Sequence, residues 1–343
     1  MPIHSAAVHT DGRPTLEVVA ARAGVSRATA SRALRGSGRV SPAARDAVLR
    51  AADEVAYTVN RAARSLVTRR SDTIAFLVAE NEDRMFRDPY FLGVLRGAQA
   101  EAAASGLQLV FVVASTDAET AQFTRYVGGG HVDGVLLVSL HRDDALAERL
   151  EQLGVPTVLN GRPFRPGASL FSVDSDNVEG ARVATSLLVE RGARAVATIT
   201  GPLDMSAGQD RLAGYRAALH AAGLAPHSVE GDFTVDGGAA AAARLLDTEP
   251  ALDAIFAASD LMALGALRTL HERGRRVPED VAVIGFDDVR EAQLASPALS
   301  TMRQPLDELG RTMTRVLLAR VAGDAEVARR TVLPTELVRR QSA

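Results

Sequence analysis

From residue 73 onward, short runs rich in β-branched residues alternate with segments whose apolar residues recur at helical spacing. Such alternation is typical of parallel β-sheets whose strands are joined by crossover helices. The runs fall into two sets that divide near residues 171–174, which predicts two similar α/β subdomains side by side. The seven expected strands are Ile74 to Ala79, Leu107 to Ala114, Gly134 to Leu140, Pro156 to Leu159, Ala195 to Thr200, Ala254 to Ala258 and Val281 to Phe286.

Polar residues directly follow most of these runs. They are Glu80-Asn81, Ser115-Thr116, Asn160-Gly161, Gly201, Ser259-Asp260 and Asp287-Asp288. In open α/β sheets a ligand binds beyond the carboxyl ends of the strands, so we expect these hydroxyls, amides and carboxylates to line one cleft. A cleft with such a lining suits a sugar or another hydroxyl-rich small molecule.

Residues 24–34, near the N-terminus, indicate the turn and second helix of a helix-turn-helix. Gly24 allows the turn, Ser26 offers an N-cap oxygen, and residues 30, 33 and 34 form an apolar face at helical spacing. The candidate DNA contacts on this helix are Ser26, Arg27, Ala28, Thr29, Ser31 and Arg32. A helix with this outward face can enter a major groove. A short surface helix of a three-helix bundle with solvated arginines fits the same pattern.

Two further helices are expected around this one. Thr15 is a possible N-cap for a helix with Leu16, Val19, Ala20 and Ala23 on one face. Ser41-Pro42 is an N-cap followed by proline at the first helical position, which predicts a third helix. Its expected apolar stripe is Val48, Leu49, Ala52, Val55 and Ala56.

The charge is divided unevenly along the chain. Residues 1–70 hold 12 arginines against 5 acidic residues, and the remainder holds 27 against 37, which together give the net charge of −3. A basic head on an acidic body is the arrangement expected of a protein that places one end on a phosphate backbone. The two segments are therefore predicted to have different partners.

A basic segment, residues 57–71, follows the third helix. It is either a flexible tether or a segment that folds only on DNA. In the second case Leu66 inserts between base steps of the minor groove while the arginines meet phosphates. The candidate DNA contacts in this segment are Asn60, Arg61, Ala63, Arg64 and Leu66.

The sequence argues against several other classes of protein. It has no cysteine, which excludes disulfides, thiolate zinc sites and cysteine nucleophiles. The seven histidines show no metal-ligand spacing, and the sequence contains no P-loop, no dinucleotide-binding glycine motif, no G-x-S-x-G and no H-E-x-x-H. We therefore expect no metal, no cofactor and no enzymatic activity. Without a membrane-spanning run or a signal peptide, the chain is expected to be cytoplasmic.

The segments 16–34, 40–45 and 60–66 together resemble the DNA-binding head and hinge of the LacI/GalR family of bacterial transcription regulators, and the likeness continues along the chain. The chain departs from the family at Val59, where proline is usual, and at Ala30, where valine is usual. The resemblance implies a repressor in which the head and hinge bind an operator and an effector changes the angle between the subdomains. It also implies a homodimer, because two heads read a palindromic operator.

The resemblance further implies an effector site. Arg211 and Asp287 correspond to family positions that hold the ligand, and together they favour the vicinal hydroxyls of a sugar, although an arginine there equally suits a carboxylate or a base. The expected effector-binding residues are Tyr90, Phe91, Asn160, Arg211, Phe233, Ser259, Asp287 and Gln304. Structural roles are the alternatives. Arg211 could pair with Asp210 or Glu190 on a solvated face, while Phe233 could be core and Asp287 an N-cap.

Residues 296–305 resemble the family's return crossover into the first subdomain. The expected organisation is a disordered tail over 1–13, a helix-turn-helix domain over 14–59, a hinge over 60–71 and an effector-binding and dimerisation domain over 72–343. Within the last, the first subdomain spans about 72–172 plus 304–332 and the second about 173–303 plus 333–343. Helices near 92–104 and 261–270 are expected at the dimer interface, and the C-terminal residues show no leucine heptads of a tetramerisation tail.

A two-lobed solute-binding protein of the transport type would share the α/β body and is the alternative interpretation. Such a protein carries a signal peptide and has no basic head, which is the reverse of what this chain shows. The sequence therefore favours a DNA-binding regulator, while the identities of its effector and operator stay open.

Overall fold

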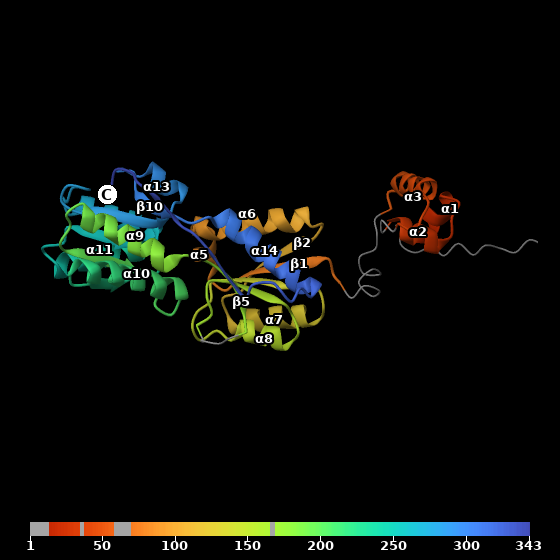
Figure 1. Cartoon of the computed structure of the whole chain (residues 1–343), viewed down its shortest axis with the longest axis horizontal. Helices are drawn as coiled ribbons and strands as arrows, with labels where there is room; N and C mark the ends of the chain where they lie inside the picture. The colour runs from red at the N-terminus through yellow and green to blue at the C-terminus, as the bar shows by residue number, and fades with distance from the viewer. Residues whose placement is uncertain (1–13, 35–37, 58–69, 165–168) are drawn as a thin grey trace, which may run out of the picture. The chain divides into compact units, whose positions relative to one another are not determined.

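The computed structural model describes residues 14–34, 38–57, 70–164 and 169–343. The chain divides into two compact units, the head (residues 1–71) and the body (residues 72–343), whose helices and strands are labelled in Figure 1. The expected tail over 1–13 lies outside the described residues. So do the expected hinge contacts Asn60, Arg61, Ala63, Arg64 and Leu66.

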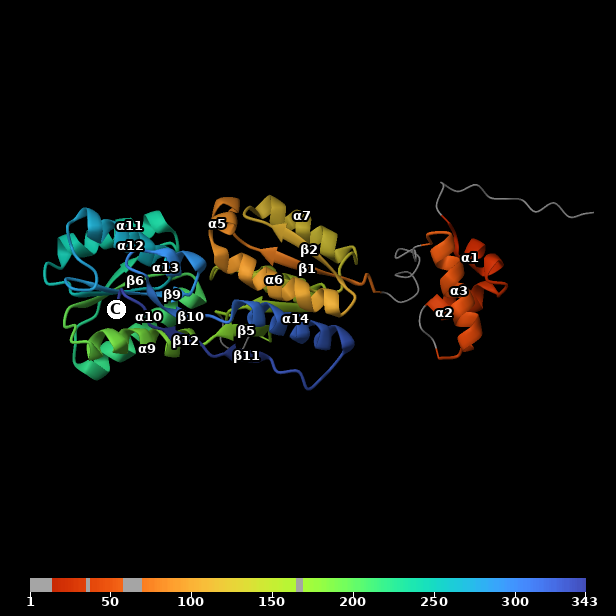
Figure 2. The same cartoon turned by 90° about the horizontal axis from the view of Figure 1, so that it is seen from above.

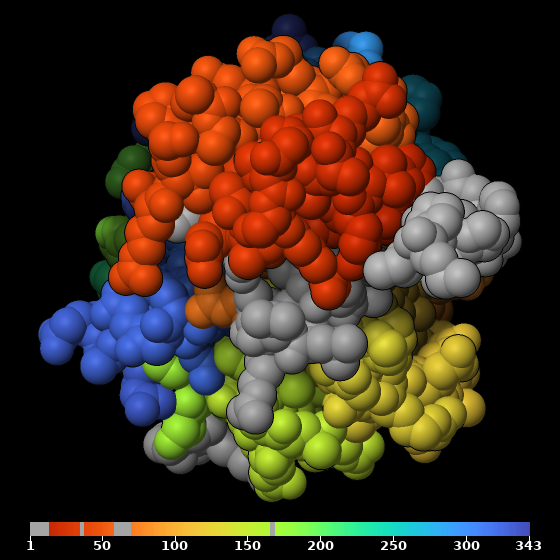
Figure 3. Space-filling view, turned by 90° about the vertical axis from the view of Figure 1, so that its right-hand side faces the viewer, coloured from red at the N-terminus to blue at the C-terminus, as the bar shows by residue number. Residues whose placement is uncertain are grey.

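In the described part of the head there are three helices, as the sequence predicts: α1 (Leu16–Arg22), α2 (Arg27–Leu34) and α3 (Pro42–Glu54). Their apolar faces meet in one small core, and Figure 3 shows their atoms, red to orange, packed against one another. The most deeply buried members of this core are Val19, Ala20, Ala30, Ala33, Val48, Ala51 and Ala52. Since most of them are alanines, the core buries little apolar surface for its length of chain.

Small residues define how the helices of the head begin. Gly24 adopts a φ of +66°, which only a residue without a Cβ reaches without strain, and this makes the turn between α1 and α2. The Oγ atom of Ser26 accepts the backbone N–H of Thr29 at 3.2 Å and so caps α2. Ser41 caps α3 in the same way, by accepting the N–H of Ala44 at 3.3 Å.

Two details of the head differ from the sequence prediction. Thr15 stands at the N-cap of α1, but its side chain accepts no backbone N–H. Leu49 and Ala56 do not join the inward face of α3, because Leu49 is 44% exposed and Ala56 lies beyond the end of the helix with a φ of +50°. Ala51 is buried instead, so the apolar stripe runs along a slightly different line of the helix.

The body contains two six-stranded sheets. The first has the strand order β11-β5-β4-β3-β1-β2 and is parallel throughout. Its strands are β1 (Thr73–Val78), β2 (Gln108–Val113), β3 (Val135–Val138), β4 (Thr157–Asn160), β5 (Phe171–Ser175) and β11 (Arg330–Leu333). The second has the order β12-β10-β9-β8-β6-β7, with only β12 antiparallel to its neighbour. Its strands are β6 (Val196–Thr200), β7 (His227–Glu230), β8 (Ala254–Ala257), β9 (Ala282–Asp287), β10 (Ser300–Arg303) and β12 (Glu336–Val338).

Helices cover both faces of each sheet (Figures 1 and 2). On the first sheet, α6 and α14 share one core and α7 and α8 the other, while on the second α9 and α10 lie opposite α11 and α12. The helices are α5 (Glu82–Arg87), α6 (Pro89–Ala104), α7 (Asp117–Gly128), α8 (Leu146–Gln152), α9 (Asn177–Glu190), α10 (Ser206–Ala222), α11 (Val235–Thr248), α12 (Asp260–Glu272), α13 (Arg290–Leu294) and α14 (Leu306–Ala322). In the described parts of the chain, no helix combines the length and the apolar character that a membrane span requires.

The strand β1 shows why the expected strands lack polar residues. Its side chains alternate between the two faces of the sheet, so that Phe76 packs toward α6 and α14 while Leu77 packs toward α7 and α8. Both faces are covered by helices, and both residues are fully buried. A strand in this position has to be apolar along its whole length, and this produces the run by which the sequence reveals it.

Five strands are absent from the sequence prediction, namely β5, β7, β10, β11 and β12. The strand β5 carries Ser172 and Asp174 and therefore lacks a continuous apolar run, while β7 and β12 lie at sheet edges and are short. The expected subdomain boundaries at 172–173 and 332–333 fall inside β5 and β11, both of which belong wholly to the first sheet.

The chain passes between the two subdomains three times. It crosses at residues 175–177 between β5 and α9, at 303–306 between β10 and α14, and at 333–336 between β11 and β12. These three crossovers connect subdomains that otherwise each have their own sheet and cores.

The helix pair α6 and α14 packs unusually closely, because glycines face each other's backbones. A Cβ atom added to Gly97 of α6 would lie 1.9 Å from the carbonyl oxygen of Asp307, and one added to Gly310 of α14 would lie 2.0 Å from that of Val94. The pair α11 and α12 is built in the same way through Gly238 and Gly265. Each subdomain therefore behaves as a tightly packed block.

Candidate functional site

A cleft lies between the two subdomains, and all eight residues expected to bind an effector line it. The space between its atoms is about 710 Å³, part of which is open solvent. The first subdomain contributes Arg84, Asp88, Tyr90, Phe91, Ser139, Leu140, Asn160, Gly161 and Arg162. The second contributes Met205, Ser206, Ala207, Arg211, Phe233, Ser259 and Asp287, and the crossovers and their flanks contribute Asp174, Asn177 and Gln304.

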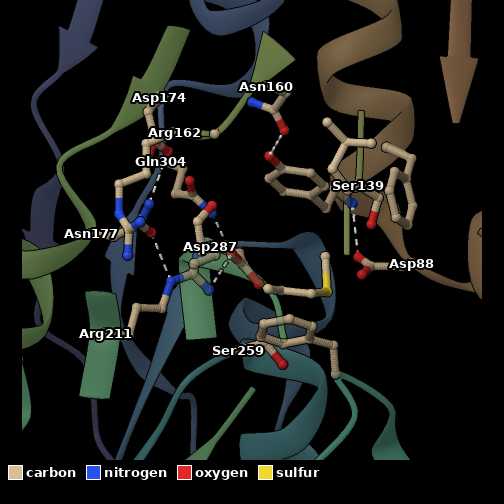
Figure 4. A pocket seen from close by; sticks show the side chains of 18 of the residues that line it. Asp88, Ser139, Asn160, Arg162, Asp174, Asn177, Arg211, Ser259, Asp287 and Gln304 are labelled. Carbon is tan, nitrogen blue, oxygen red and sulfur yellow. Dashed lines mark hydrogen bonds and ion pairs between the residues drawn. The ribbon is translucent and has the colours of Figure 1, made fainter. Parts of the chain in front are cut away.

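Arg211 of α10 is held rigidly in this cleft, as Figure 4 shows. Its Nε donates to Oδ1 of Asn177 at 2.8 Å and its Nη1 donates to the carbonyl oxygen of Ala258 at 2.5 Å. The guanidinium carbon lies 3.9 Å from the centre of the Phe286 ring. Arg211 is only 4% exposed, so the alternative of a solvated ion pair with Asp210 or Glu190 is wrong.

Asp287 stands at the end of β9, 3.7 Å from Nη1 of Arg211. Its Oδ1 accepts a hydrogen bond from Nε2 of Gln304 at 2.6 Å. Burial raises the pKa of Asp287 well above its usual value, although the charge of Arg211 opposes the shift. The N-cap of the following helix is Val289, so the alternative of a capping role for Asp287 is wrong.

Two other buried aspartates line the cleft. Asp174 accepts the side-chain N–H of Asn177 at 2.9 Å, and burial followed by the nearby charge of Asp210 raises its pKa to about 6. Asp88 caps α6 by accepting the N–H of Tyr90 at 3.0 Å, and burial raises its pKa as well. Both carboxylates keep acceptor oxygens that a ligand hydroxyl could use.

Each arginine of the cleft has an acidic partner. Arg84 forms an ion pair with Glu80, which does not itself line the cleft, and Arg162 forms a bidentate pair with Asp210 at 2.7 to 3.0 Å. Burial raises the pKa of Asp88, Asp174 and Asp287 in spite of the nearby arginines. The cleft thus disfavours negative charge, and an anionic ligand would meet the same penalty.

Aromatic rings flank the polar groups. Tyr90 and Phe91 meet edge to face with their ring centres 5.5 Å apart, and the Tyr90 hydroxyl donates to Oδ1 of Asn160 at 2.5 Å. Phe233 belongs both to the cleft and to the core of the second subdomain, so its expected role and its structural alternative both apply. A Cβ atom on Gly201 would lie 2.0 Å from the Phe233 ring, so glycine there makes room for it.

Three residues that line the cleft adopt backbone conformations that L-residues avoid. The φ angle is +64° at Ser139, +65° at Phe233 and +129° at Asp287. Such conformations cost on the order of 1–3 kcal/mol each and persist where function requires a particular side-chain position. Their gathering in one cleft supports a functional rather than a structural role for it.

The rule that polar residues after each strand line a cleft is correct for some pairs and wrong for others. Asn160-Gly161, Ser259 and Asp287 do line it, although Ser259 also caps α12. Asn81 and Thr116 instead cap α5 and α7, because a helix that follows a strand needs the same residue types at its start. Asp260 and Asp288 are engaged by Thr301, Arg303 and Arg340.

Several residues of the cleft are absent from the sequence prediction, among them Arg84, Asp88, Arg162, Asp174 and Asn177. Asp174 and Asn177 follow from the same strand-end rule once β5 is known to be a strand. Asp88 lies in the segment quoted for its aromatic neighbours and carries a visible N-cap signal, aspartate before proline. No sequence signal points to Arg84.

The expected DNA-contacting residues of the described head run from the N-cap of α2, Ser26, to its last turn, which holds Arg32. Arg27, Ala28 and Arg32 are exposed, and the Nε atom of Arg27 lies 2.9 Å from Oε1 of Glu17. The hydroxyls of Ser26 and Thr29 are 2.9 Å apart. Ser31 is partly buried. Within the described residues, no group of three or more histidines and acidic residues is arranged to hold a metal ion.

Comparison with known proteins covers nearly the whole chain. Residues 15–60 match the model of bacterial regulatory proteins of the lacI family, and residues 185–343 match that of a periplasmic binding protein-like domain. The HTH-type transcriptional regulator CelR of Thermobifida fusca is 50% identical over 96% of this chain and 98% of its own.

Two solved structures extend the comparison. A transcriptional regulator CelR–cellobiose complex is 47% identical, with a TM-score of 0.78 over 96% of this chain and 100% of the other. A lac repressor dimer bound to operator and the anti-inducer ONPF is 27% identical, with a TM-score of 0.83 over 96% of this chain and 99% of the other.

Proposed function

Since the chain belongs to the lacI family of bacterial regulatory proteins, we propose that it is a repressor. A neutral carbohydrate in the cleft controls the affinity of this repressor for its operator. The carbohydrate is of the cellobiose type, a disaccharide of glucose. The observation that carries this proposal is the fixed guanidinium of Arg211 among the buried aspartates Asp88, Asp174 and Asp287.

The chemistry of the cleft favours a neutral polyhydroxyl ligand. Carboxylates and amides accept and donate to sugar hydroxyls, and the faces of Phe233 and Phe91 offer apolar contact to the C–H face of a sugar ring. Burial raises the pKa of these carboxyl groups, so the cleft disfavours further negative charge and with it a sugar phosphate or an organic acid. The similarity to a regulator solved with cellobiose makes that disaccharide the first candidate.

The DNA end of the molecule is the head. We assign contacts with base edges and phosphates to Ser26, Arg27, Ala28, Thr29, Ser31 and Arg32, and contacts near the minor groove to the hinge residues 60–66. A repressor of this kind works where the DNA is, in the cytoplasm. The similarity to a repressor dimer on its operator supports a dimer and a palindromic site.

The exposed apolar residues of the body support dimerisation through α6 and its neighbour α5. Leu92 of α6 is 51% exposed and Phe86 of α5 is 66% exposed. The second helix expected at the interface, residues 261–270, exposes less apolar surface. Leu261, Leu267 and Leu270 are buried, the last two in the core that α12 shares with α11 and the second sheet. The carboxylates of the cleft have a binding rather than a catalytic role in this proposal.

Two measurements on the purified full-length protein test the function. Calorimetry compares cellobiose with glucose, ribose and glucose 6-phosphate, and we expect binding of cellobiose and none of the phosphate. Fluorescence anisotropy then follows a duplex from the protein's own promoter region, whose affinity should change by at least tenfold when cellobiose is added. Tight binding of the phosphate, or an operator affinity that no neutral sugar alters, would contradict the proposal.

A further inference from the structure

Glu17 of α1 lies against Arg27, the first residue of α2. The Nε atom of Arg27 is 2.9 Å from Oε1 of Glu17, and the two side chains are 72% and 59% exposed. An exposed ion pair of this kind adds little to the stability of a domain. Its consequence is therefore geometric, since it restricts where a long and otherwise adaptable side chain points.

The carboxylate that makes this contact carries its negative charge at neutral pH. The pKa of Glu17 lies below its usual value, mainly because of its own backbone N–H and further because of the Thr15 side chain and the charge of Arg27. The ion pair with Arg27 is therefore present at neutral pH.

The position of the contact leaves the other end of the guanidinium available. The nearest approach of Glu17 is to Nε, on the inner edge of the group. Arginine reads guanine by donating from its fork to O6 and N7 in the major groove. The first residues of a recognition helix are the ones that reach base edges. The neighbouring Ala28 has no hydrogen-bonding group with which to compete for that base.

We propose that Glu17 is a positioning residue that holds the fork of Arg27 toward a guanine of the operator and so sets the base preference at that position. This inference rests on the proposed function, in which α2 enters the major groove. Glu17 does not touch the base and acts only through Arg27. Its effect is therefore on sequence preference rather than on the strength of binding to DNA in general.

The head contains a matched control for this ion pair. Arg22 of α1 and Glu54 of α3 pair through Nε and Oε2 at 2.6 Å, and their side chains are 57% and 52% exposed. This second pair has the same chemistry and similar exposure but involves no residue of α2. Removing Glu54 changes the charge of the head by the same amount as removing Glu17.

The experiment uses the full-length protein and operator duplexes selected from a random library by the wild type. Each guanine of the preferred half-site is replaced in turn, and affinities are measured for the wild type and for Glu17→Ala, Glu17→Gln, Glu54→Ala and Arg27→Ala. We expect Glu17→Ala to lower the preference for one guanine by about threefold, within the range of an exposed ion pair. Affinity for unrelated DNA should rise slightly, because a negative charge is lost.

The other variants complete the pattern. Glu17→Gln keeps an oxygen beside Nε and should retain most of the preference, whereas Arg27→Ala should abolish it at the same base. Glu54→Ala should raise affinity for all DNA and leave the preference unchanged. If Arg27→Ala removes the guanine preference while Glu17→Ala does not, the positioning role is wrong and the DNA-binding surface stands. If Arg27→Ala leaves every preference intact, both the positioning role and the assignment of Arg27 to the DNA-binding surface are wrong.

Discussion

His141 of the first subdomain meets Asp204 of the second, with 2.7 Å between Nδ1 and Oδ2. The other ring nitrogen of His141 lies 3.3 Å from Oε1 of Glu80, so the imidazole bridges two carboxylates. The backbone N–H of Arg142 donates to the carbonyl oxygen of Asp204 at 2.8 Å and strengthens the same junction. These contacts lie outside the crossovers, and they form only when the subdomains stand as close together as they do here.

The first prediction concerns pH. The hydrogen bonds to Glu80 and then to Asp204 raise the pKa of His141 to about 9, against the effect of burial. With the subdomains apart, His141 keeps Glu80, which belongs to its own subdomain, and loses only Asp204, so its pKa falls part of the way toward 6.5. The contact between His141 and Asp204 therefore stabilises this arrangement of the subdomains fully below about pH 6.5, and the stabilisation is lost as pH rises through 9. Effector affinity measured by calorimetry should therefore fall roughly two- to fivefold between these values. His141→Gln should flatten the profile, and the control His220→Gln, on the exposed side of α10, should not.

The second prediction is that Asp174 lowers the stability of the fold while it contributes to effector binding. Burial and the charge of Asp210 raise the pKa of Asp174 to about 6, so ionisation of this carboxyl destabilises the fold increasingly as pH rises from 3.8 through 6. Asp174→Asn should therefore raise the free energy of unfolding at pH 8 by about 1–2 kcal/mol, which is seen as a higher melting temperature. The substitution should have less effect at pH 4. Effector affinity should drop about tenfold. Asp236→Asn, at an exposed position of α11, is the control for both measurements.

The third prediction tests the guanidinium at the centre of the cleft. Arg211→Lys keeps the charge but loses the hydrogen bonds to Asn177 and to the carbonyl of Ala258. Effector affinity should fall about a hundredfold, which corresponds to roughly 3 kcal/mol for charge-assisted hydrogen bonds. Arg216→Lys, exposed on the same helix, should bind normally. An unchanged affinity in a folded Arg211→Lys protein would place the effector elsewhere.

The fourth prediction concerns the packing of α6 on α14. In Gly310→Ala the new methyl group would meet the carbonyl oxygen of Val94 at 2.0 Å, so the helices have to move apart. We expect a loss of about 2 kcal/mol or more, seen as a lower melting temperature. Gly128→Ala at the end of α7 meets only a Leu153 methyl at 3.9 Å and should be neutral or slightly stabilising.

The fifth prediction addresses the dimer. Leu92→Glu places a charge on the exposed apolar surface of α6 and should convert the dimer to monomers in analytical ultracentrifugation. Operator affinity should fall at least a hundredfold, because each head then binds its half-site alone. Leu153→Glu is a control of equal chemistry, since Leu153 is 50% exposed beside α8. A dimer that survives Leu92→Glu would move the interface to another face.

How far the sequence predicts this fold depends on burial. The seven strands it reveals are apolar because helices cover both of their faces, whereas β5 carries Ser172 and Asp174 and is invisible to the same test. The small edge strands β7, β11 and β12 are defined by their neighbours rather than by their own residues. In the head, Gly24, Ser26 and Ser41 act locally through turns and caps, and the sequence predicts all three correctly.

The site shows the same division. The strand-end rule finds Asn160 and Asp287, because topology alone brings the carboxyl ends of strands to one edge. It misleads at Asn81 and Thr116, since a helix cap and a ligand contact use the same residue types. The position of Arg211 came from the family resemblance and not from its neighbours, and its partner Asn177 depends on an unrecognised strand. Contacts between subdomains, such as that of His141 with Asp204, leave no sequence pattern at all.

Two of the three crossovers carry cleft side chains of their own, Asn177 in the first and Gln304 in the second. A ligand that fills the cleft would therefore lie against these two crossovers as well as against the two subdomains. Ligand binding and regulation are therefore separable. A ligand that binds both arrangements of the subdomains equally does not shift the equilibrium between them, however tightly it binds. A sugar that engages Asn177 and Gln304 acts as an agonist, and a close analogue that fills the same space without engaging them acts as an antagonist.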